Sequence, residues 1–253
     1  MPIEICDLSL SYRERPVLHR IFLKIPEGRF SVLLGPNGSG KSTLLKAMAG
    51  QLPSPAGAVR LFGRNLSEVP VRERARLVGY LPQSHHPVFP FTVEEIVLTG
   101  RASYVFSQPG QADRRKAEEA METAGLTDLR RRPYTELSGG ERQLVLLARL
   151  LAQDSPVLLL DEPVSHLDLA NTARLLAMVR RLTQAGRTVL AVLHEPNSAF
   201  LYGNHFFFLK NGTLQQPPHP DRPWDGGFIS GLYGVPLEVV PFQGKAFLTP
   251  GLF

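Results

Sequence analysis

The stretch GPNGSGKST at residues 35–43 limits what this chain can fold into more than any other feature. It follows an apolar run at 29–34 that predicts a strand, and it leads into a helical pattern over about 41–49. Glycines let the backbone wrap around a polyphosphate with its amides pointing inward, and the helix behind adds its positive end. Strand, loop and helix in this order therefore predict an α/β fold with a phosphate-binding loop. The residues expected to surround the phosphates are Gly35, Pro36, Asn37, Gly38, Ser39, Gly40, Lys41, Ser42 and Thr43.

Two side chains of this loop are expected to carry its chemistry. Lys41 can reach the β and γ phosphates, and Ser42 can ligate Mg²⁺. The alternative is a chance glycine-rich turn. The flanking strand and helix argue against that alternative, because they supply the structural context that the motif needs.

The run VLLLDEP at residues 157–163 supplies the second half of such a site. It has the character of a buried parallel strand, and Asp161 stands at its carboxyl end, where open α/β sheets bind ligands. An Asp in this setting helps to hold Mg²⁺. Glu162 can act as a general base on water, although a solvated acid at a strand end fits it equally well when it is taken alone. Beside Lys41 and Asp161 the catalytic interpretation is the stronger one.

Two further polar residues are expected at the same edge of the sheet. His194 ends the apolar run RTVLAVLH, which is predicted to be parallel to VLLLD, so it should emerge beside Asp161 and the γ-phosphate. Gln83 follows the strand-like GYLP and can orient water or touch the metal, although a plain loop amide remains an alternative. The adjacent His85 and His86 favour a loop over a metal site, since no acid or cysteine partners accompany them.

The segment LSGGERQ at residues 137–143 raises a different question. Ser138 and Glu141 have capping-box spacing, which predicts a helix start. Gly139 and Gly140 fill the first turn, although glycine weakens a helix by about 1 kcal/mol relative to alanine. Bare amides at a helix N-terminus form an anion site. The sequence thus predicts two phosphate-binding surfaces, the loop at 35–43 and this helix start. The second would bind either another anion or the nucleotide of another molecule.

Composition and charge narrow the remaining possibilities. The chain has 253 residues, a formal charge of +5 and a pI of about 9.6, with its basic residues spread along the sequence. A solvated arginine-rich surface explains this balance better than nucleic acid binding. The single cysteine, Cys6, excludes an intrachain disulfide framework. With no signal peptide and no apolar run of about 18 residues, a soluble cytoplasmic protein is expected. At a membrane, another chain would have to hold it.

At this point the sequence resembles an ATP-binding-cassette (ABC) ATPase. Six motifs appear in the order that the family has. They are the Walker A loop at 35–43, the Q-loop Gln83, the signature LSGGE at 137–141, Walker B at 157–161 with the catalytic Glu162, the D-loop SHLD at 165–168, and the switch histidine His194. Tyr12 matches the aromatic residue that stacks on adenine, although a strand-end tyrosine is the alternative. Glu195-Pro196 departs from the family pattern without removing a catalytic group.

The resemblance implies a RecA-like P-loop NTPase core with a mostly parallel sheet, an antiparallel β subdomain and an inserted helical subdomain over about 84–154. It covers residues 1–214, and the proline-rich residues 215–253 are expected to form an extension. It also implies ATP and Mg²⁺ as cofactors and a head-to-tail homodimer. In that dimer Ser138, Gly139 and Gly140 of one copy touch ATP held by the other, and the metal ligands are Ser42, Gln83 and Asp161.

A narrower resemblance is to the ATPase subunits of importers for iron–siderophore, haem, cobalamin or molybdate. It rests on LPQSHHPVFPFTVEEIVLTGR at 81–101 and on the tail LYGVPLEVV at 232–240. It implies a separate membrane permease, contacted by the loop after Gln83 and the helix near 92–100. It also implies an indirect partner in a substrate-binding protein, and a place on the cytoplasmic face of the inner membrane. A soluble ABC ATPase acting on DNA or ribosomes and an exporter subunit are the alternatives.

Overall fold

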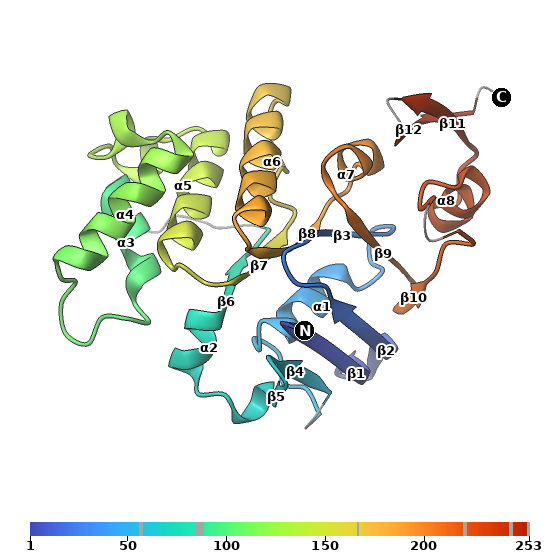
Figure 1. The fold of residues 1–253 in the computed structure, drawn as a ribbon, viewed down its shortest axis with the longest axis horizontal. Helices are drawn as coiled ribbons and strands as arrows, with labels where there is room; N and C mark the ends of the chain where they lie inside the picture. The colour runs from blue at the N-terminus through green and yellow to red at the C-terminus, as the bar shows by residue number, and fades with distance from the viewer. Residues whose placement is uncertain (56–57, 84–88, 166, 220–221, 243–244, 252–253) are drawn as a thin grey trace. The chain divides into compact units, whose positions relative to one another are not determined.

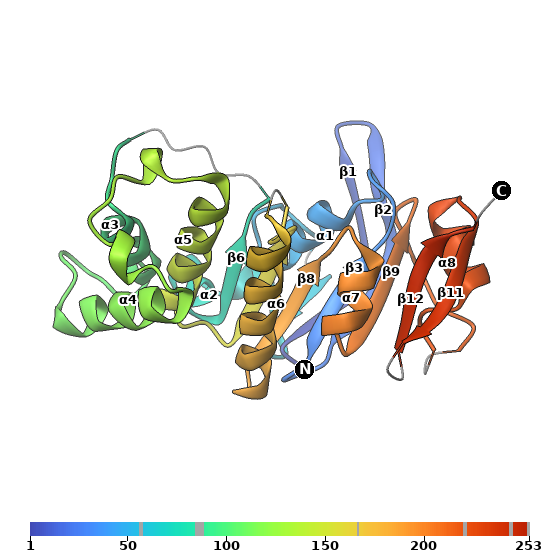
Figure 2. The ribbon, with the colours of Figure 1, turned by 90° about the horizontal axis from the view of Figure 1, so that it is seen from above.

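The computed structural model describes residues 1–55, 58–83, 89–165, 167–219, 222–242 and 245–251. The chain forms two compact units, one built from Met1–Glu68 and Val179–Phe253 and the other from Val69–Met178. Figures 1 and 2 trace the chain from two directions. The histidine pair His85–His86 lies outside the described residues.

The first unit contains an antiparallel sheet with strand order β2-β1-β4-β5. Its strands are β1 (Ile3–Tyr12), β2 (Arg15–Ile25), β4 (Val59–Leu61) and β5 (Arg64–Asn65). The long strand β2 went unrecognised in the sequence, although its apolar residues Leu18, Ile21, Leu23 and Ile25 are all buried. A turn at Phe62-Gly63, both with positive φ, separates β4 from β5.

A second sheet in this unit surrounds strand β3 (Phe30–Leu34). It is parallel to both β8 (Thr188–Val192) and β9 (His205–Lys210), and β9 continues into the antiparallel β10 (Thr213–Gln215). Every residue of β3 and β8 is buried, as the continuous apolar runs predict. Asn211-Gly212 joins β9 to β10 in a two-residue hairpin turn, and both residues have the positive φ that such a turn requires.

The proline-rich tail leads into folded structure within this same unit. Its elements are α8 (Gly226–Tyr233) and a hairpin of β11 (Leu237–Phe242) and β12 (Lys245–Pro250). Asn197 fastens β12 to α7 (Pro196–Tyr202): its amide donates to the Leu248 carbonyl at 3.0 Å and accepts from the Leu248 N–H at 2.7 Å. The tail is therefore attached by hydrogen bonds as well as by chain connectivity.

The second unit joins a parallel pair of strands to a set of helices. The strands are β6 (Val78–Leu81) and β7 (Val157–Asp161). The α-helices are α2 (Val71–Leu77), α3 (Val93–Leu98), α4 (Gln111–Ala124) and α5 (Gly139–Ala152), and α6 (Leu169–Gln184) begins here and ends in the first unit. Between 89 and 154 the structure has helices and no named strand. Short 3₁₀ turns lie at Leu66–Glu68, Thr99–Arg101, Thr127–Leu129 and Tyr134–Glu136.

Polar contacts fix the three helices α3, α4 and α5 against one another. The buried Arg101 bonds to Asp113 of α4 at 3.1 Å and to the Ala152 carbonyl at the end of α5 at 2.9 Å. A capping box of Thr92 and Glu95 starts α3. Helix α5 is buried on more than one face, because Val145, Leu146 and Leu150 are buried together with Leu144, Leu147 and Ala148.

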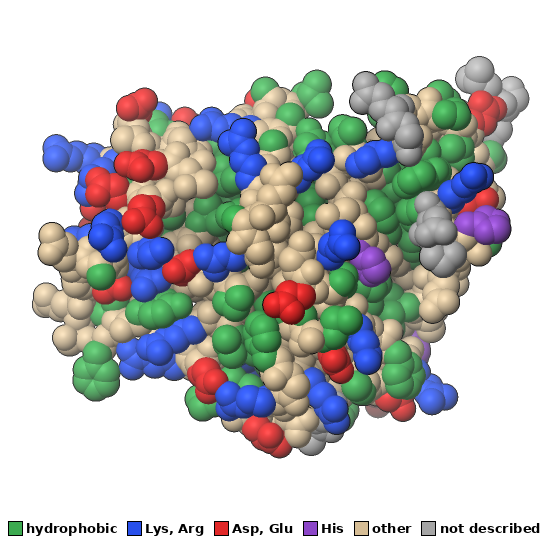
Figure 3. Space-filling view, in the orientation of Figure 1, with side chains coloured by type: hydrophobic (Ala, Val, Ile, Leu, Met, Phe, Trp, Pro, Cys, Tyr) green, Lys and Arg blue, Asp and Glu red, His purple; other side chains and the backbone are tan. Residues whose placement is uncertain are grey.

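The surface carries charge of both signs. Figure 3 shows lysine and arginine side chains spread over the visible face and interspersed with acidic and apolar ones. A distributed charge of this kind is typical of a solvated surface rather than of a single nucleic acid footprint. Among the described residues, no helix combines the length and apolar character needed to cross a membrane.

Candidate nucleotide site

The phosphate loop is held at both ends by neighbouring backbone and side chains. Gly35, at φ 152°, lies against β9 so closely that an added Cβ would stand 2.0 Å from the Leu209 carbonyl oxygen. Gly40, at φ 104°, begins helix α1 (Lys41–Met48), and a Cβ there would meet the Leu18 side chain at 2.8 Å. Because side chains are excluded at both positions, the loop between them is held in a fixed conformation.

The interior of the loop presents hydrogen-bond donors. The Lys41 ammonium is buried and donates to the carbonyls of Gly35 at 2.8 Å and Pro36 at 2.9 Å. The Ser39 hydroxyl is buried and has no hydrogen-bond partner among the described residues. Gly40, the N-cap of α1, has no side chain to cap the first turn, which contains Ser42 and Thr43, so the amides that begin this helix lack an N-cap side chain. An ammonium, a buried hydroxyl and open helix amides suit the oxygens of a polyphosphate. Pro36, Asn37 and Gly38 form the more exposed rim.

Tyr233 of α8 lies near Gly35 of the same loop, although its hydroxyl has no hydrogen-bond partner among the described residues, and it was missed as a site residue in the sequence. Burial raises the pKa of its phenol to about 12, a shift that the backbone of Gly35 opposes and the charge of Glu195 reinforces. Tyr233 is the last residue of α8, and Gly234 ends that helix with a φ of 74°. The only indication in the sequence was the segment LYGVP, which resembles the family but indicates no role for the tyrosine.

In the second unit two adjacent carboxylates stand at the end of β7. Asp161 is 1% exposed and accepts a hydrogen bond from the Tyr80 hydroxyl of β6 at 3.2 Å. Glu162 is 8% exposed and accepts from the Gln83 amide at 2.6 Å. Parallel pairing explains both contacts, because β6 and β7 end at the same edge of the sheet. The sequence indicated Gln83 but not Tyr80, which lies within an ordinary strand pattern.

The backbone of Glu162 is itself unusual. Its φ of 53° is left-handed, a conformation that costs an L-residue about 1–2 kcal/mol. The Glu162 carbonyl accepts hydrogen bonds from the Ser165 N–H at 3.1 Å and the Ser165 hydroxyl at 3.0 Å, so the turn into the D-loop fixes it. Such strain is typical of functional sites, where the surrounding structure fixes one side-chain direction. His166 of the D-loop lies outside the described residues.

The signature segment starts helix α5 as a confirmed capping box. The Ser138 N–H donates to Glu141 at 2.7 Å, and this bond lowers the pKa of the Glu141 carboxyl. An added Cβ at Gly139 would meet no atom within 4 Å, and at Gly140 the nearest would be Leu167 at 3.4 Å. The fold of this chain therefore requires glycine at neither position. The Ser138 hydroxyl accepts from the Glu141 N–H at 3.2 Å and keeps its own proton to donate.

The remaining site residues are exposed. Tyr12 ends β1 with 48% of its surface exposed, and His194 follows β8. Glu195 caps α7 by accepting from the N–H groups of Asn197 and Ser198, and Pro196 occupies the first helical position, where proline is favoured. The phosphate loop and His194 belong to one unit, and Gln83, Asp161 and Glu162 belong to the other. Their meeting at one nucleotide remains a prediction.

A protein-family model described as ABC transporter matches residues 18–165. The chain belongs to that family. It is accordingly an ATP-binding cassette of the ABC ATPase class, which confirms the resemblance and the α/β fold class that the motifs indicated.

Individual relatives extend over nearly the whole chain. The hemin import ATP-binding protein HmuV of Gloeobacter violaceus is 42% identical over 94% of this chain and 93% of its own length. The ABC transporter ATP-binding protein YvrA of Bacillus subtilis is 40% identical over 94% of this chain, which spans about half, 55%, of that relative.

Two solved structures are also similar. One is an inward-facing conformation of a metal-chelate type ABC transporter, at a TM-score of 0.84 and 27% identity, covering 99% of this chain and 98% of the other. The second is a dimeric ATP-binding cassette in a post-hydrolysis state bound to ADP and Pi. It has a TM-score of 0.76 and 26% identity, and the match covers 85% of this chain and 97% of the other.

Tyr233→Phe should change how stability depends on pH. Because the folded state raises the phenol pKa from 10 to about 12, the neutral form contributes stability below pH 10, and that contribution is lost as the pH rises from 10 to 12. The loss amounts to at most about 2–3 kcal/mol. Urea unfolding at pH 8 and pH 11 should show a smaller alkaline loss in the variant than in the natural chain. Equal losses in both would contradict the assigned burial.

Proposed function

We propose that this chain is the ATP-hydrolysing subunit of an ABC importer that takes up a metal chelate such as iron–siderophore, haem or cobalamin. The observation that carries hydrolysis is the buried pair Asp161–Glu162, with Gln83 bonded to Glu162 at 2.6 Å. Importer function is supported by the hemin-import relative and by the metal-chelate type transporter of similar structure. In this proposal the chain works at the cytoplasmic face of the inner membrane, under a separate permease. A substrate-binding protein delivers the metal chelate to that permease.

The phosphates of ATP would lie in the loop of residues 35–43, with the Lys41 ammonium and the open amides of α1 around them. Tyr12 would stack on the adenine, which its exposed ring permits. The residues that would hold Mg²⁺ are Ser42, Gln83 and Asp161, whose hydroxyl, amide and carboxylate oxygens are of the kind that Mg²⁺ prefers. When bound, the ion supplies charge neutralisation on the phosphates.

Glu162 is the proposed general base. Its carboxylate is buried, its backbone conformation is constrained, and the Gln83 amide orients one of its oxygens. It would accept a proton from the attacking water while Gln83 helps to position that water. His194, exposed at the end of β8, would donate to the γ-phosphate. General bases of this kind contribute about 10²- to 10⁴-fold to a rate.

The complete site is proposed to need two copies of the chain. Ser138, Gly139 and Gly140 would approach the γ-phosphate of ATP bound by the partner, in a head-to-tail homodimer. The space around Gly139 supports this proposal, because nothing in the chain itself requires glycine there. The dimeric solved cassette of similar fold supports it too.

The contact with the permease is proposed for the segment that follows Gln83 and for helix α3. Phe89 and Phe91, just ahead of α3, are 62% and 50% exposed, with ring centroids 6.0 Å apart. Exposed aromatic pairs of this kind mark protein interfaces. We also retain the proposed boundaries, an ATPase domain over 1–214 with a helical insertion over about 84–154 and an extension over 215–253.

Glu162→Gln should bind ATP as tightly as the natural chain but turn it over at least about 100-fold more slowly. Because hydrolysis releases the closed dimer, the variant with ATP should elute as a dimer in size-exclusion chromatography. Glu122→Gln, an exposed position on α4, is the matched control and should hydrolyse normally. Normal turnover by the Glu162 variant would remove Glu162 as the base.

The variant Gly139→Ala tests whether the signature segment needs its first glycine for folding or for ATP turnover. The added methyl group meets open space, so the free energy of unfolding should be unchanged or higher by up to about 1 kcal/mol. ATP turnover should nevertheless fall at least about tenfold, because the methyl group would stand between the helix amides and the partner's phosphate. Gly231→Ala, whose methyl group also meets open space, should hydrolyse normally. Full activity of Gly139→Ala would exclude a close phosphate approach at that glycine.

Transport is tested with a candidate permease, a protein with many membrane spans sought in the neighbouring reading frames. Co-expressed with it, the chain should be recovered in the membrane fraction, and uptake of hemin or a ferric siderophore should depend on Glu162. Phe91→Ser should reduce membrane recovery and leave ATP binding intact, whereas Phe62→Ser, at another exposed phenylalanine, should change neither. Recovery with ribosomes or DNA in place of the permease would overturn the importer proposal.

A further inference from the structure

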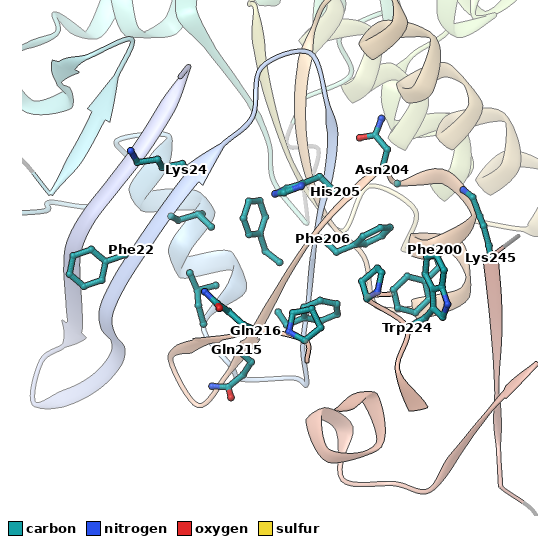
Figure 4. A pocket seen from close by; sticks show the side chains of 17 residues that line it. Phe22, Lys24, Phe200, Asn204, His205, Phe206, Gln215, Gln216, Trp224 and Lys245 are labelled. Atoms are coloured by element: carbon teal, nitrogen blue, oxygen red, sulfur yellow. The ribbon is translucent and has the colours of Figure 1, made fainter. Parts of the chain in front are cut away.

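The first unit contains a hollow of about 770 Å³ that is separate from the phosphate loop. Its walls come from β2, α7, β9, the segment after β10, and the first residue of β12 (Figure 4). None of the loop residues 35–43 lines it. The volume lies within the roughly 300–1,000 Å³ that is usual for small-molecule sites.

Aromatic rings form much of the lining. Phe200 meets Phe206 edge-on, with ring centroids 5.3 Å apart, and meets Trp224 in the same manner at 6.0 Å. Facing them from β2, Phe22 is 57% exposed, although it is large and apolar. Figure 4 shows Phe22 on one side of the hollow and the group of Phe200, Phe206 and Trp224 on the other. Rings on two sides favour a flat, apolar occupant that can stack or contact them edge-on.

The charged residues of the lining that the structure describes are Lys24 and Lys245, and none of the described lining residues is Asp or Glu. The Lys245 ammonium donates to the Leu201 carbonyl at 2.6 Å, and burial lowers its pKa, as burial also does for the imidazole of His205. Glu4 lies opposite Lys24 on β1 but does not line the hollow. A wall whose described residues carry positive and no negative charge is complementary to an anion.

Backbone at the sheet edge adds polar contacts. Strand β10 pairs with β9 only as far as Phe208. On the edge of β9 away from β3, His205, Phe206 and Phe207 therefore border the hollow with no paired strand among the described residues. Edge strands present N–H and C=O groups that a ligand can bond. A mostly apolar wall with a few polar groups is the usual constitution of a small-molecule site.

We propose that this hollow binds a flat, largely apolar small molecule that carries one anionic group, a carboxylate or a sulfonate. The rings of Phe22, Phe206 and Trp224 hold its apolar part, and Lys24, on the Phe22 side of the hollow, holds its charge. Walls from five separate segments suit a compact molecule rather than an extended chain. The site is independent of ATP hydrolysis and of the importer assignment, because it shares no residue with the nucleotide site.

The test uses 1-anilinonaphthalene-8-sulfonate as the anionic probe and N-phenyl-1-naphthylamine, which lacks the sulfonate, as its neutral match. Trp224 is the only tryptophan of the chain, so quenching of its fluorescence reports binding directly. Phe22→Ala should weaken both probes about tenfold, since one buried aromatic contact is lost. Lys24→Gln should weaken only the sulfonate, by about two- to fivefold. Phe62→Ala, 43% exposed outside the hollow, should leave both affinities unchanged.

Saturating ATP should not displace either probe, and the turnover of ATP by Phe22→Ala should equal that of the natural chain. Unchanged probe affinity in both β2 variants would overturn the proposal. Displacement by ATP would also overturn it, because the probe would then lie in the nucleotide site. If Phe62→Ala weakened the binding of both probes as much as Phe22→Ala does, the probes would be binding to exposed aromatic rings in general and not to this hollow, which would also overturn the proposal. None of these outcomes tests the role of Glu162, so this experiment and the tests of the proposed function can fail independently.

Discussion

The close approach of the Gly35 backbone to strand β9 is the contact on which the rest of the nucleotide unit depends. An added Cβ would lie 2.0 Å from the Leu209 carbonyl, so loop and strand touch backbone to backbone. The hairpin that follows β9 extends this contact, because the Gly212 N–H donates to the Ser39 carbonyl at 3.1 Å and the Gly212 carbonyl accepts from the His19 N–H at 2.8 Å. The phosphate loop therefore rests on a strand that comes more than 170 residues later in the sequence (209 − 35 = 174), and its shape depends on the fold of the whole unit.

Much of this arrangement could be predicted from the sequence, because the informative signals are local. The strand–loop–helix at residues 29–49 and the capping boxes at Thr92 and Ser138 depend on neighbouring residues alone. Apolar runs identified β7 and β8 for the same reason. The long strand β2 escaped notice because Arg15, His19, Arg20 and Lys24 interrupt its apolar residues, and its alternation is irregular at a bulge opposite Leu8.

Other features could not be predicted because they arise from contacts between distant segments. Tyr80 looks like any strand residue until β6 is placed beside β7 and its hydroxyl meets Asp161. Tyr233 becomes a site residue only when α8 folds back to the phosphate loop. The left-handed backbone of Glu162 has no signature in the sequence either, since glutamate rarely adopts it. Sequence motifs thus identified the reacting groups, and the structure supplied the residues that support them.

The folded tail has a consequence for how the cassette can be divided. The Phe208 ring of β9, fully buried, meets Phe228 of α8 edge-on at 5.0 Å, and Phe200 of α7 meets Trp224 at 6.0 Å. A chain cut after residue 214 would keep every nucleotide motif and lose both partner rings. Two aromatic side chains would then face water, and each buries on the order of 150–250 Å² when covered. The shortest piece that carries all the motifs would therefore be prone to self-association, whereas a piece that continues through β12 keeps both rings covered.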